Sequence, residues 1–343
     1  MAVFSLVHAS DLHIGVRPDF TNGYDAGSYL GWFKQAFSRE IAGSITPSTF
    51  WPDVASRFTH EMDQLAEELD AIIITGDIAT TGSKADVRAA ADFIKGVVPS
   101  SWVGSERAFR PLVADFLPPV ILMPGNHDRY EPPSLRPQSL EFETAFGPCW
   151  DFSPTNTGQF AHHRFAHTVE IQKDDCSLVI CTVDFSLPDL SDALPAGKLG
   201  LGYLGQGIVK RKQNLPYAKL TPLDELVQQT EWAKENIENC SVVWCVHFPP
   251  AFPSIASDMQ LIDEHYLIDA AEELGIKIIL SGHTHVYRSY LARSGLRVIC
   301  CGTTTAKSTS SGHQYLRLEI DTNNMFNPKV IPKRYDFALK RFV

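Results

Sequence analysis

Short apolar segments that stop abruptly at Asp, Asn and His side chains constrain the fold of this chain more than any other feature. The central segment covers residues 118–124, and the sequence GNHD follows it at residues 125–128. An apolar run bounded by Pro and Gly predicts a buried strand that ends at the edge of a sheet. The polar residues then lie in the loop at the carboxyl end of that strand, where open α/β sheets bind their ligands.

Four further apolar segments end in the same way, each followed within a few residues by an Asp or a His. Helical patterns separate them, for example at residues 54–69 and 263–274, so strands and helices alternate along the chain. This alternation predicts an α/β fold. The segments and the polar residues after them are 3–9 with Asp11 and His13, 71–75 with Asp77, 241–246 with His247, and 276–280 with His283 and His285.

Two of the predicted helices begin with residues that suit a helix N-terminus. Ser83 precedes one helical pattern and Asp86 follows it three residues later, while Thr221 is followed by Pro222 and then by Asp224. These spacings predict an N-cap at Ser83 and a capping box at Thr221. A shorter helix is expected at 140–146, and antiparallel strands are expected at 159–184, 297–301 and 314–320.

The spacing of the polar residues predicts a metal site. Alternate residues of an extended backbone point the same way, so Asp11 and His13, and likewise His283 and His285, would direct their side chains into one cavity. Carboxylate, imidazole and amide donors suit Mn, Fe or Zn. The seven cysteines show no Cys-x-x-Cys spacing and lie mostly in apolar runs, so buried free thiols are expected instead of disulfides.

The motifs DLH, GDI, GNHD, VH and GHTH occur in this order between residues 11 and 285. The set resembles the calcineurin-like metallophosphoesterase family, and within it is most similar to the bacterial branch that includes class III cyclic-nucleotide phosphodiesterases. The resemblance implies a four-layer αββα sandwich, two mixed β-sheets flanked by helices. No Pro/Ser/Gly-rich linker divides the chain, so one domain is expected over residues 1–343, with insertions at about 14–52 and 187–220.

The resemblance also implies a role for each polar residue. Two divalent or trivalent ions of Mn, Fe or Zn would share Asp77, and a water bridging them would lose its proton and attack phosphorus. His127 would position the phosphate and protonate the leaving oxygen, and Asp128 would orient His127. The implied ligands are Asp11, His13, Asp77 and His285 for one ion, and Asp77, Asn126, His247 and His283 for the other.

These expectations describe an enzyme that hydrolyses a small phosphodiester, such as a cyclic nucleotide or another nucleotide-like or lipid-head-group diester. Two alternatives stay open: a phosphomonoesterase, for example one that acts on phosphoprotein, and a non-catalytic scaffold that keeps only the fold. The scaffold is disfavoured because all the expected ligands are present. The formal net charge of −10 argues against extended nucleic-acid binding, whereas metal ions could still attract a small anion.

The sequence also bears on location. It contains no apolar run of about 18 residues, so no membrane-spanning helix is expected. The first residues lack the basic leader of a signal peptide, which favours a cytoplasmic protein. The sequence indicates no particular oligomeric state.

Some remaining residues allow two interpretations. His8 lies inside an apolar strand, and a hydrogen-bonded core histidine is the expected role. Arg129 and Tyr130 follow the central loop and are candidates for lining the pocket. Surface or packing roles are favoured over ligand binding for His162, His163 and His167, for the basic triplet Lys210, Arg211 and Lys212, and for the aromatic residues Tyr24, Tyr29, Trp32 and Phe33 near a short helix expected at 30–42.

Overall fold

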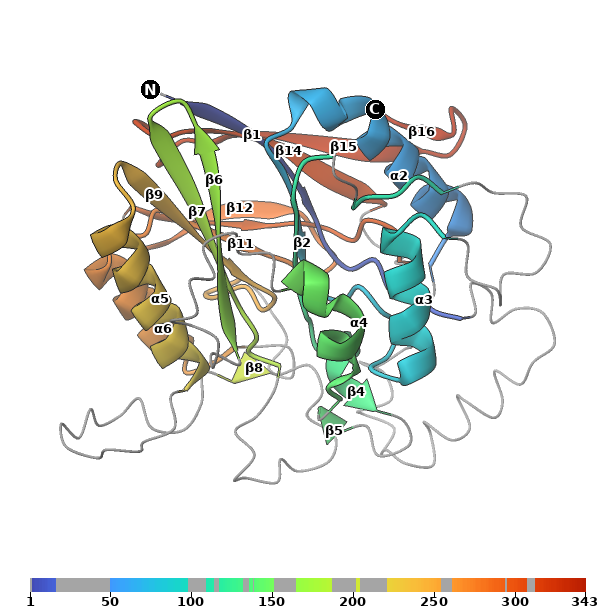
Figure 1. The fold of residues 1–343 in the computed structure, drawn as a ribbon, viewed down its shortest axis with the longest axis horizontal. Helices are drawn as coiled ribbons and strands as arrows, with labels where there is room; N and C mark the ends of the chain where they lie inside the picture. Colours follow the sequence, from blue (N-terminus) through green and yellow to red (C-terminus); the bar gives the residue numbers. More distant parts are fainter. Residues whose placement is uncertain are drawn as a thin grey trace.

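Two six-stranded sheets form the centre of the molecule in the computed structural model (Figure 1). The described residues are 2–16, 50–97, 109–113, 117–131, 136–137, 139–150, 165–186, 202–203, 221–253, 261–293, 295–306 and 312–343. The expectations for the short helix at 30–42, the aromatic residues of the first insertion, His162, His163 and the basic triplet lie outside these residues.

The first sheet is mixed. It contains, in spatial order, β16 (Arg341–Phe342), β15 (Lys329–Asp336), β14 (Gln314–Asp321), β1 (Val3–Ala9), β2 (Ala71–Thr75) and β3 (Val120–Met123). β1, β2 and β3 are parallel to one another, whereas β14 pairs antiparallel with both β1 and β15. The carboxyl ends of β1, β2 and β3 therefore lie at one edge of this sheet.

The second sheet is also mixed. It contains, in spatial order, β12 (Arg288–Arg293), β13 (Leu296–Cys300), β11 (Ile278–Ser281), β9 (Cys240–Val246), β7 (Cys176–Val183) and β6 (Ala166–Lys173). Its four middle strands are parallel, and the edge strands β6 and β12 pair antiparallel with their neighbours. The carboxyl ends of β9 and β11 thus share one edge as well.

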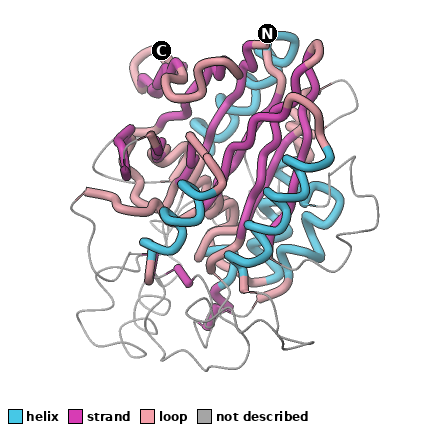
Figure 2. The backbone as a smooth tube through the Cα atoms, turned by 90° about the vertical axis from the view of Figure 1, so that its left-hand side faces the viewer, coloured by secondary structure: helices cyan, strands magenta, loops and turns pink. Residues whose placement is uncertain are grey.

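Helices cover the outer faces of both sheets, which gives the expected four layers. The helices on the side of the first sheet are α2 (Pro52–Leu65), α3 (Lys84–Ile94) and α4 (Glu141–Trp150), and those on the second are α5 (Pro222–Asn236) and α6 (Glu264–Glu273). Figure 2, seen from the side of α5 and α6, shows helices running along the strands. Short pairings join β4 (Tyr130–Glu131) to β5 (Arg136–Pro137) and β8 (Gly202–Tyr203) to β10 (Leu261–Ile262).

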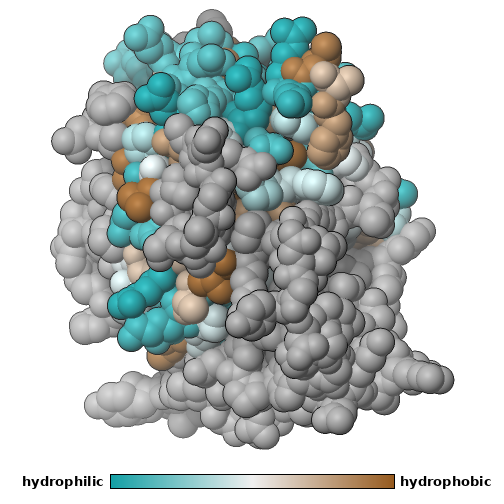
Figure 3. Space-filling model, turned by 90° about the vertical axis from the view of Figure 1, so that its right-hand side faces the viewer, coloured by the Kyte–Doolittle hydropathy of each residue, from teal (hydrophilic) through white to brown (hydrophobic). Residues whose placement is uncertain are grey.

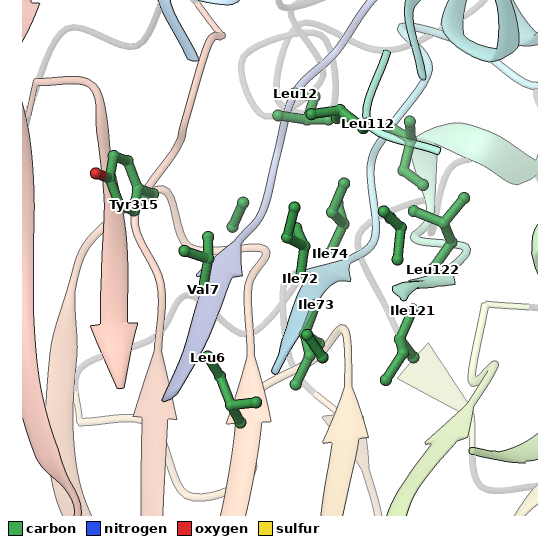
Figure 4. Close-up of a cluster of buried hydrophobic side chains, with 14 of the residues drawn as sticks. Leu6, Val7, Leu12, Ile72, Ile73, Ile74, Leu112, Ile121, Leu122 and Tyr315 are labelled. Atoms are coloured by element: carbon green, nitrogen blue, oxygen red, sulfur yellow. The ribbon is translucent and has the colours of Figure 1, made fainter. Parts of the chain in front are cut away.

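Apolar side chains fill the space between the sheets and beneath the helices. One cluster combines residues of both sheets with α2 and α3, and a second joins the other face of the second sheet to α5 and α6. Figure 4 shows Leu6 and Ile73 on one side of the first sheet and Val7 and Ile72 on the other. All four are buried, as expected for parallel strands that are covered on both faces.

The predicted helix starts are confirmed. The Ser83 hydroxyl accepts a hydrogen bond from the Asp86 backbone N–H at 3.3 Å, and Thr221 forms a capping box with Asp224 at the start of α5. α2 ends earlier than the predicted helix, because Ala66–Glu68 form a 3-10 turn, η1. A second such turn, η2 (His127–Arg129), lies in the central loop.

Strands β12 and β15 have no counterpart among the sequence-based expectations. β12 is mostly exposed and carries Arg288 and Arg293, and β15 is only partly buried and contains Pro332. Charged and Pro-containing strands near a sheet edge lack the apolar alternation by which strands are recognised.

The remaining global expectations concern cysteines and the membrane. The six described cysteines are free thiols, as expected. Among the helices that the structure describes, none combines the length and apolar character that crossing a membrane requires. Where its residues are described, the face in Figure 3 is largely hydrophilic, with a few apolar side chains among the polar ones.

Candidate dinuclear metal centre

The polar residues selected from the sequence meet at the joined carboxyl edges of the two sheets. Asp11 and His13 follow β1, Asp77 follows β2, Asn126 and His127 follow β3, His247 follows β9, and His283 and His285 follow β11. Their ligand atoms form three overlapping groups: Asp11, His13 and His285; His13, Asp77 and His127; and Asp77, His247 and His283. In each group the ligand atoms lie within 4.8 Å of one another.

The first group is compact. His285 Nε2 lies 3.1 Å from Asp11 Oδ1, and His13 Nε2 lies 3.2 Å from His285 Nε2 and 3.8 Å from Asp11 Oδ1. Asp11 is also fixed by its other oxygen, Oδ2, which accepts the backbone N–H of His283 at 3.0 Å. Three donors from the ends of β1 and β11 therefore face one small volume.

The group formed by Asp77, His247 and His283 centres on Asp77. His247 Nε2 lies 3.3 Å from Asp77 Oδ2 and 2.9 Å from Asn126 Oδ1, and the His283 ring lies 5.0 Å from the His247 ring, centre to centre. His13 Nε2 is 3.7 Å from the same oxygen of Asp77, on the side of the first group. Asp77 thus stands between this group and the first one, in the position that a bridging ligand requires.

The donor set and its spacing fit metal ions. Two ligands bound at about 2.1 Å and separated by roughly 90–110° at the metal lie about 3.0–3.5 Å apart, which the observed distances approach. The buried His283 Nε2 also has no hydrogen-bond partner among the described residues. Buried polar atoms normally find partners, so this nitrogen indicates a ligand position.

The backbone that presents these ligands is left-handed. Asp11, His13, Asp77, His283 and His285 have φ between 51° and 70°. Non-glycine residues rarely adopt this region, and such strain concentrates at functional sites. The expectation that extended backbone aligns the Asp-x-His and His-x-His pairs is therefore wrong: their side chains reach the site from turns.

Glycines allow the loops to approach the ligands closely. A Cβ on Gly125 would collide with Asp77, a Cβ on Gly76 would collide with His247, and a Cβ on Gly282 would collide with Ser10 and Asp11. Gly76 also has φ of +93°, a conformation that other residues rarely adopt. The glycines of the GDI, GNHD and GHTH motifs are thus required by close packing at the centre.

The buried imidazoles and carboxylates of the centre shift each other's pKa. Burial would raise the pKa of Asp77, but His247 and His127 lower it below its ordinary value. Burial would lower the pKa of His247, but Asp77 raises it to about 9. Burial lowers the pKa of His13 to about 4 and that of His283 to about 3. A proton on His247 beside Asp77 would supply a positive charge there, and metal binding to His247 would release that proton.

The Asp128 carboxylate stabilises the loops and does not orient His127. It accepts backbone N–H groups from Ala79 at 2.7 Å, Gly125 at 2.8 Å and Ile78 at 3.2 Å. The expected contact with the imidazole is replaced by the backbone carbonyl of Thr80, which lies 2.8 Å from His127 Nδ1. Asp128 therefore joins the loop after β2 to the loop after β3.

His127 is held at the open side of the cluster. Its backbone N–H donates to Asp77 Oδ1 at 2.8 Å, and its ring lies 4.5 Å from that of His13, centre to centre. It is partly exposed, whereas Asp11, His13 and His247 are fully buried. A carbonyl can only accept, so the contact with Thr80 places a proton on Nδ1 of His127.

Arg129 does not line the pocket. Its side chain is buried, and its guanidinium contacts Asp184 and Glu143. The other candidate, Tyr130, lies in β4, and its side chain is outside the described part of the structure. His8 is a buried core histidine as expected, with Nε2 2.9 Å from the Thr75 hydroxyl.

Some supporting residues were missed from the sequence. The segment Thr303–Thr305 follows β13, and its hydroxyls contact the turn that carries Asp11 and His13: Thr303 donates to the Asp11 carbonyl at 2.9 Å. The Thr75 carbonyl accepts from His247 Nδ1 at 2.7 Å and so orients that imidazole. The sequence signal for this segment is three consecutive threonines after an apolar run. This pattern does not indicate that the threonines contact the turn with Asp11 and His13.

Comparison with known proteins places the chain in a family. The family model described as calcineurin-like phosphoesterase matches residues 4–287. A dimetal phosphatase from Danio rerio is 13% identical, with a TM-score of 0.45, over 97% of this chain and 99% of that one. The protein TT1561 of Thermus thermophilus is 11% identical, with a TM-score of 0.47, over 97% and 99%. GAP50, the anchor in the inner membrane complex of Plasmodium, is 12% identical, with a TM-score of 0.45, over 98% and 85%.

A search of curated proteins found no match. The family match, in contrast, extends across well over half of the chain and includes every predicted ligand. The expected family is therefore confirmed: the protein belongs to the calcineurin-like phosphoesterase family.

Proposed function

We propose that this protein is a metal-dependent hydrolase of a small phosphodiester and that the chain works as one metallophosphoesterase domain. One observation carries the proposal: ligand-type side chains from the ends of five strands converge around the buried carboxylate of Asp77. Membership of the phosphoesterase family supports the reaction class.

Seven residues would hold two metal ions, with Mn, Fe and Zn the candidates for this nitrogen and oxygen donor set. When bound, such a pair supplies Lewis-acid chemistry, because it polarises the phosphoryl group and makes water a stronger nucleophile at neutral pH. The proposed ligands are Asp11, His13, Asp77 and His285 for one ion, and Asp77, Asn126, His247 and His283 for the other.

His127 is the proposed proton donor to the leaving oxygen. The Thr80 carbonyl fixes one proton on Nδ1 and the Asp77 contact fixes the backbone, so the ring is oriented before substrate arrives. The second proton of the imidazolium, on Nε2, is the one transferred to the leaving group. Proton transfer from a positioned imidazole typically contributes about 10²–10⁴-fold to the rate.

The arrangement of Arg129 supports a diester over a monoester. A phosphomonoester carries more negative charge near neutral pH than a diester does, and it gains more from an additional cation. Arg129 belongs to the central loop, but its guanidinium faces Asp184 and Glu143 and is fully buried. The cation closest in sequence to His127 is therefore neutralised within the protein.

Parallel assays on protein stripped of metal and then supplied with Mn, Fe or Zn test the proposal. Bis-p-nitrophenyl phosphate and p-nitrophenyl phosphate compare the two ester classes, and cyclic nucleotides and lipid-head-group diesters extend the panel. We expect metal-dependent turnover with preference for diesters. A strong preference for p-nitrophenyl phosphate would identify a monoesterase, and failure both to bind metal and to hydrolyse any ester would identify a scaffold.

A further inference from the structure

Arg129 follows His127 by two residues, and its buried side chain has carboxylates on both sides. Nε donates to Asp184 Oδ2 at 2.9 Å, and Nη2 lies 2.8 Å from the same oxygen. Nη1 donates to Glu143 Oε2 at 2.8 Å, and Nη2 donates to Glu143 Oε1 at 2.5 Å. Nη1 also donates to the Ser139 carbonyl at 2.9 Å. Each N–H group of the planar guanidinium thus has an oxygen acceptor from Asp184, Glu143 or Ser139.

These partners come from both halves of the molecule. Asp184 directly follows β7 of the second sheet, Glu143 lies on α4, and Arg129 itself belongs to the loop after β3 of the first sheet. Burial alone would lower the pKa of Arg129, but Asp184 and Glu143 raise it above its ordinary value, so the guanidinium stays charged. The side chain therefore ties the loop to the opposite sheet through charge-assisted hydrogen bonds.

The backbone connects the anchored Arg129 side chain rigidly to His127. His127 and Arg129 share the single turn η2, the Arg129 N–H donates to the Asn126 carbonyl at 3.1 Å, and the Arg129 carbonyl accepts from Ser139 at 3.1 Å. A rotation of this turn would move the imidazole away from the Thr80 carbonyl. Displacements of about 1 Å can cost about a hundredfold in rate when a reacting group must be aligned.

We propose that Arg129 is a positioning residue for phosphoester hydrolysis. By holding the turn at residues 127–129 against Asp184 and Glu143, it keeps the His127 imidazole aligned for proton transfer to the leaving oxygen. The inference rests on the proposed function, because it requires His127 to be the proton donor.

A positioning role and a merely structural role predict different kinetics. A structural role lowers stability and reduces turnover of all substrates alike. A positioning role makes the loss depend on the leaving group, because p-nitrophenolate departs readily without a proton whereas a poorer leaving group needs one. Methyl p-nitrophenyl phosphate and methyl phenyl phosphate, which differ only in the leaving group, provide this comparison.

The variants Arg129→Lys, Asp184→Asn and Glu143→Gln weaken the anchor, and His127→Ala removes the proposed donor. Thr230→Val is the matched control, because Thr230 accepts a buried hydrogen bond from Trp244 Nε1 at 2.8 Å where α5 packs on β9. With Mn²⁺ present, we expect Arg129→Lys to lower kcat for methyl phenyl phosphate about tenfold more than for methyl p-nitrophenyl phosphate. His127→Ala should shift the ratio of the two kcat values in the same direction, and Thr230→Val should leave this ratio unchanged.

Each outcome decides one of the two claims. An unchanged ratio in the anchor variants, with a shifted ratio in His127→Ala, overturns the role of Arg129 and leaves the proposed function intact. An unchanged ratio in His127→Ala overturns that residue's part in the proposed function. If Arg129→Lys does not fold, Glu143→Gln carries the test, since the Glu143 side chain is 32% exposed and tolerates the change better.

A spectroscopic measurement on the metal-free protein tests the positioning without any turnover. In the wild type and in Thr230→Val, the Nδ1–H proton of His127 should exchange slowly in nuclear magnetic resonance spectra, because it is held by the Thr80 carbonyl. In Arg129→Lys, or in Glu143→Gln, it should exchange at least severalfold faster. Unchanged exchange in these variants would remove Arg129 from the alignment of His127.

Discussion

Gly125 occupies a position in which a single added methyl group would disturb the proposed metal centre. A Cβ there would overlap Asp77 and also approach His247 Cε1 at 2.8 Å, and both belong to the proposed second ion site. We expect Gly125→Ala to displace Asp77 and to reduce bound metal from two ions per chain to one or none, with turnover falling at least about a hundredfold. Elemental analysis and diester hydrolysis measure the two effects.

Gly147→Ala is the control for this substitution, because no described residue lies within 4 Å of a Cβ built on Gly147 in α4. There the change should leave metal content and turnover unaltered. Two metal ions per chain in Gly125→Ala would show that the loop can move, and that the close packing is not required.

His8 should make the protein less stable in acid. Burial lowers its pKa to about 3, with Asp11 opposing the shift, whereas the unfolded chain has the ordinary value of 6.5. The unfolded state therefore binds the proton first. The contribution of His8 to the free energy of unfolding is therefore complete above pH 6.5. It is lost as the pH falls toward 3, at about 1.4 kcal/mol per pH unit.

The variant His8→Gln tests this pH dependence, because its amide can replace Nε2 in the contact with Thr75. The difference in unfolding free energy between variant and wild type should shift in favour of the variant as the pH is lowered from 6.5 to about 4.5. Denaturant titrations across this range measure it. Parallel stability curves would contradict the assignment, whatever their constant offset.

At the scale of single residues, the sequence predicted which side chains meet but not how the backbone presents them. Apolar runs that stop at Asp and His identify strand ends, and the parallel order of strands brings those ends together. The left-handed turns at Asp11 and Asp77 are set by contacts with other loops, such as the 3.1 Å hydrogen bond from the Asp11 N–H to the Gly76 carbonyl. A local sequence pattern does not indicate which distant loop will form such hydrogen bonds.

At the scale of elements, each loop of the centre is stabilised by a different segment of the chain. Asp128 binds backbone groups of the loop after β2, and Arg129 binds Asp184 after β7. Both contacts join residues about fifty positions apart. The expected role of Asp128 was assigned from its neighbour in sequence, and it failed because a buried carboxylate is stabilised by several backbone N–H groups.

Thr303 offers a test of this support at the loop after β13. Its hydroxyl donates to the Asp11 carbonyl at 2.9 Å and accepts the Ala306 N–H at 3.1 Å. Thr303→Val should lower the affinity for the ion held by Asp11, His13 and His285 about 10–100-fold, because groups that orient ligands typically contribute that much to metal affinity. The other ion should be affected less, so a metal titration should separate into two affinities.

The substitution Thr322→Val serves as the matched control. Thr322 donates to the Ala2 carbonyl at 3.3 Å, at the amino end of the first sheet, opposite the edge that carries the centre. A local role for the threonine segment would be contradicted if Thr303→Val lowered the affinity for both ions equally. It would also be contradicted if the two valine variants had equal effects on metal affinity.

At the scale of the whole molecule, the two sheets contribute different ligands to the same centre. Asp11, Asp77 and Asn126 follow strands of the first sheet, while His247 and His283 follow strands of the second. The apolar core joins the sheets along their length, and the metal ions would join them at one edge. Bound metal should therefore act as a clamp between the two halves, and its removal should loosen the same edge of both.

Removal of metal by a chelator should lower the melting temperature by several degrees. A ligand at about a hundred times its dissociation constant stabilises the folded state by about 2.7 kcal/mol, and about 1 kcal/mol corresponds to roughly 2–4 °C in a chain of about 150–250 residues. Amide hydrogen exchange should accelerate together after β2 and after β9, but not at the amino end of β1, which pairs with β14. Asp77→Asn should show little further response to the chelator. Faster exchange in one sheet only would mean that the ions are held within that sheet, and the shared position of Asp77 would then be wrong.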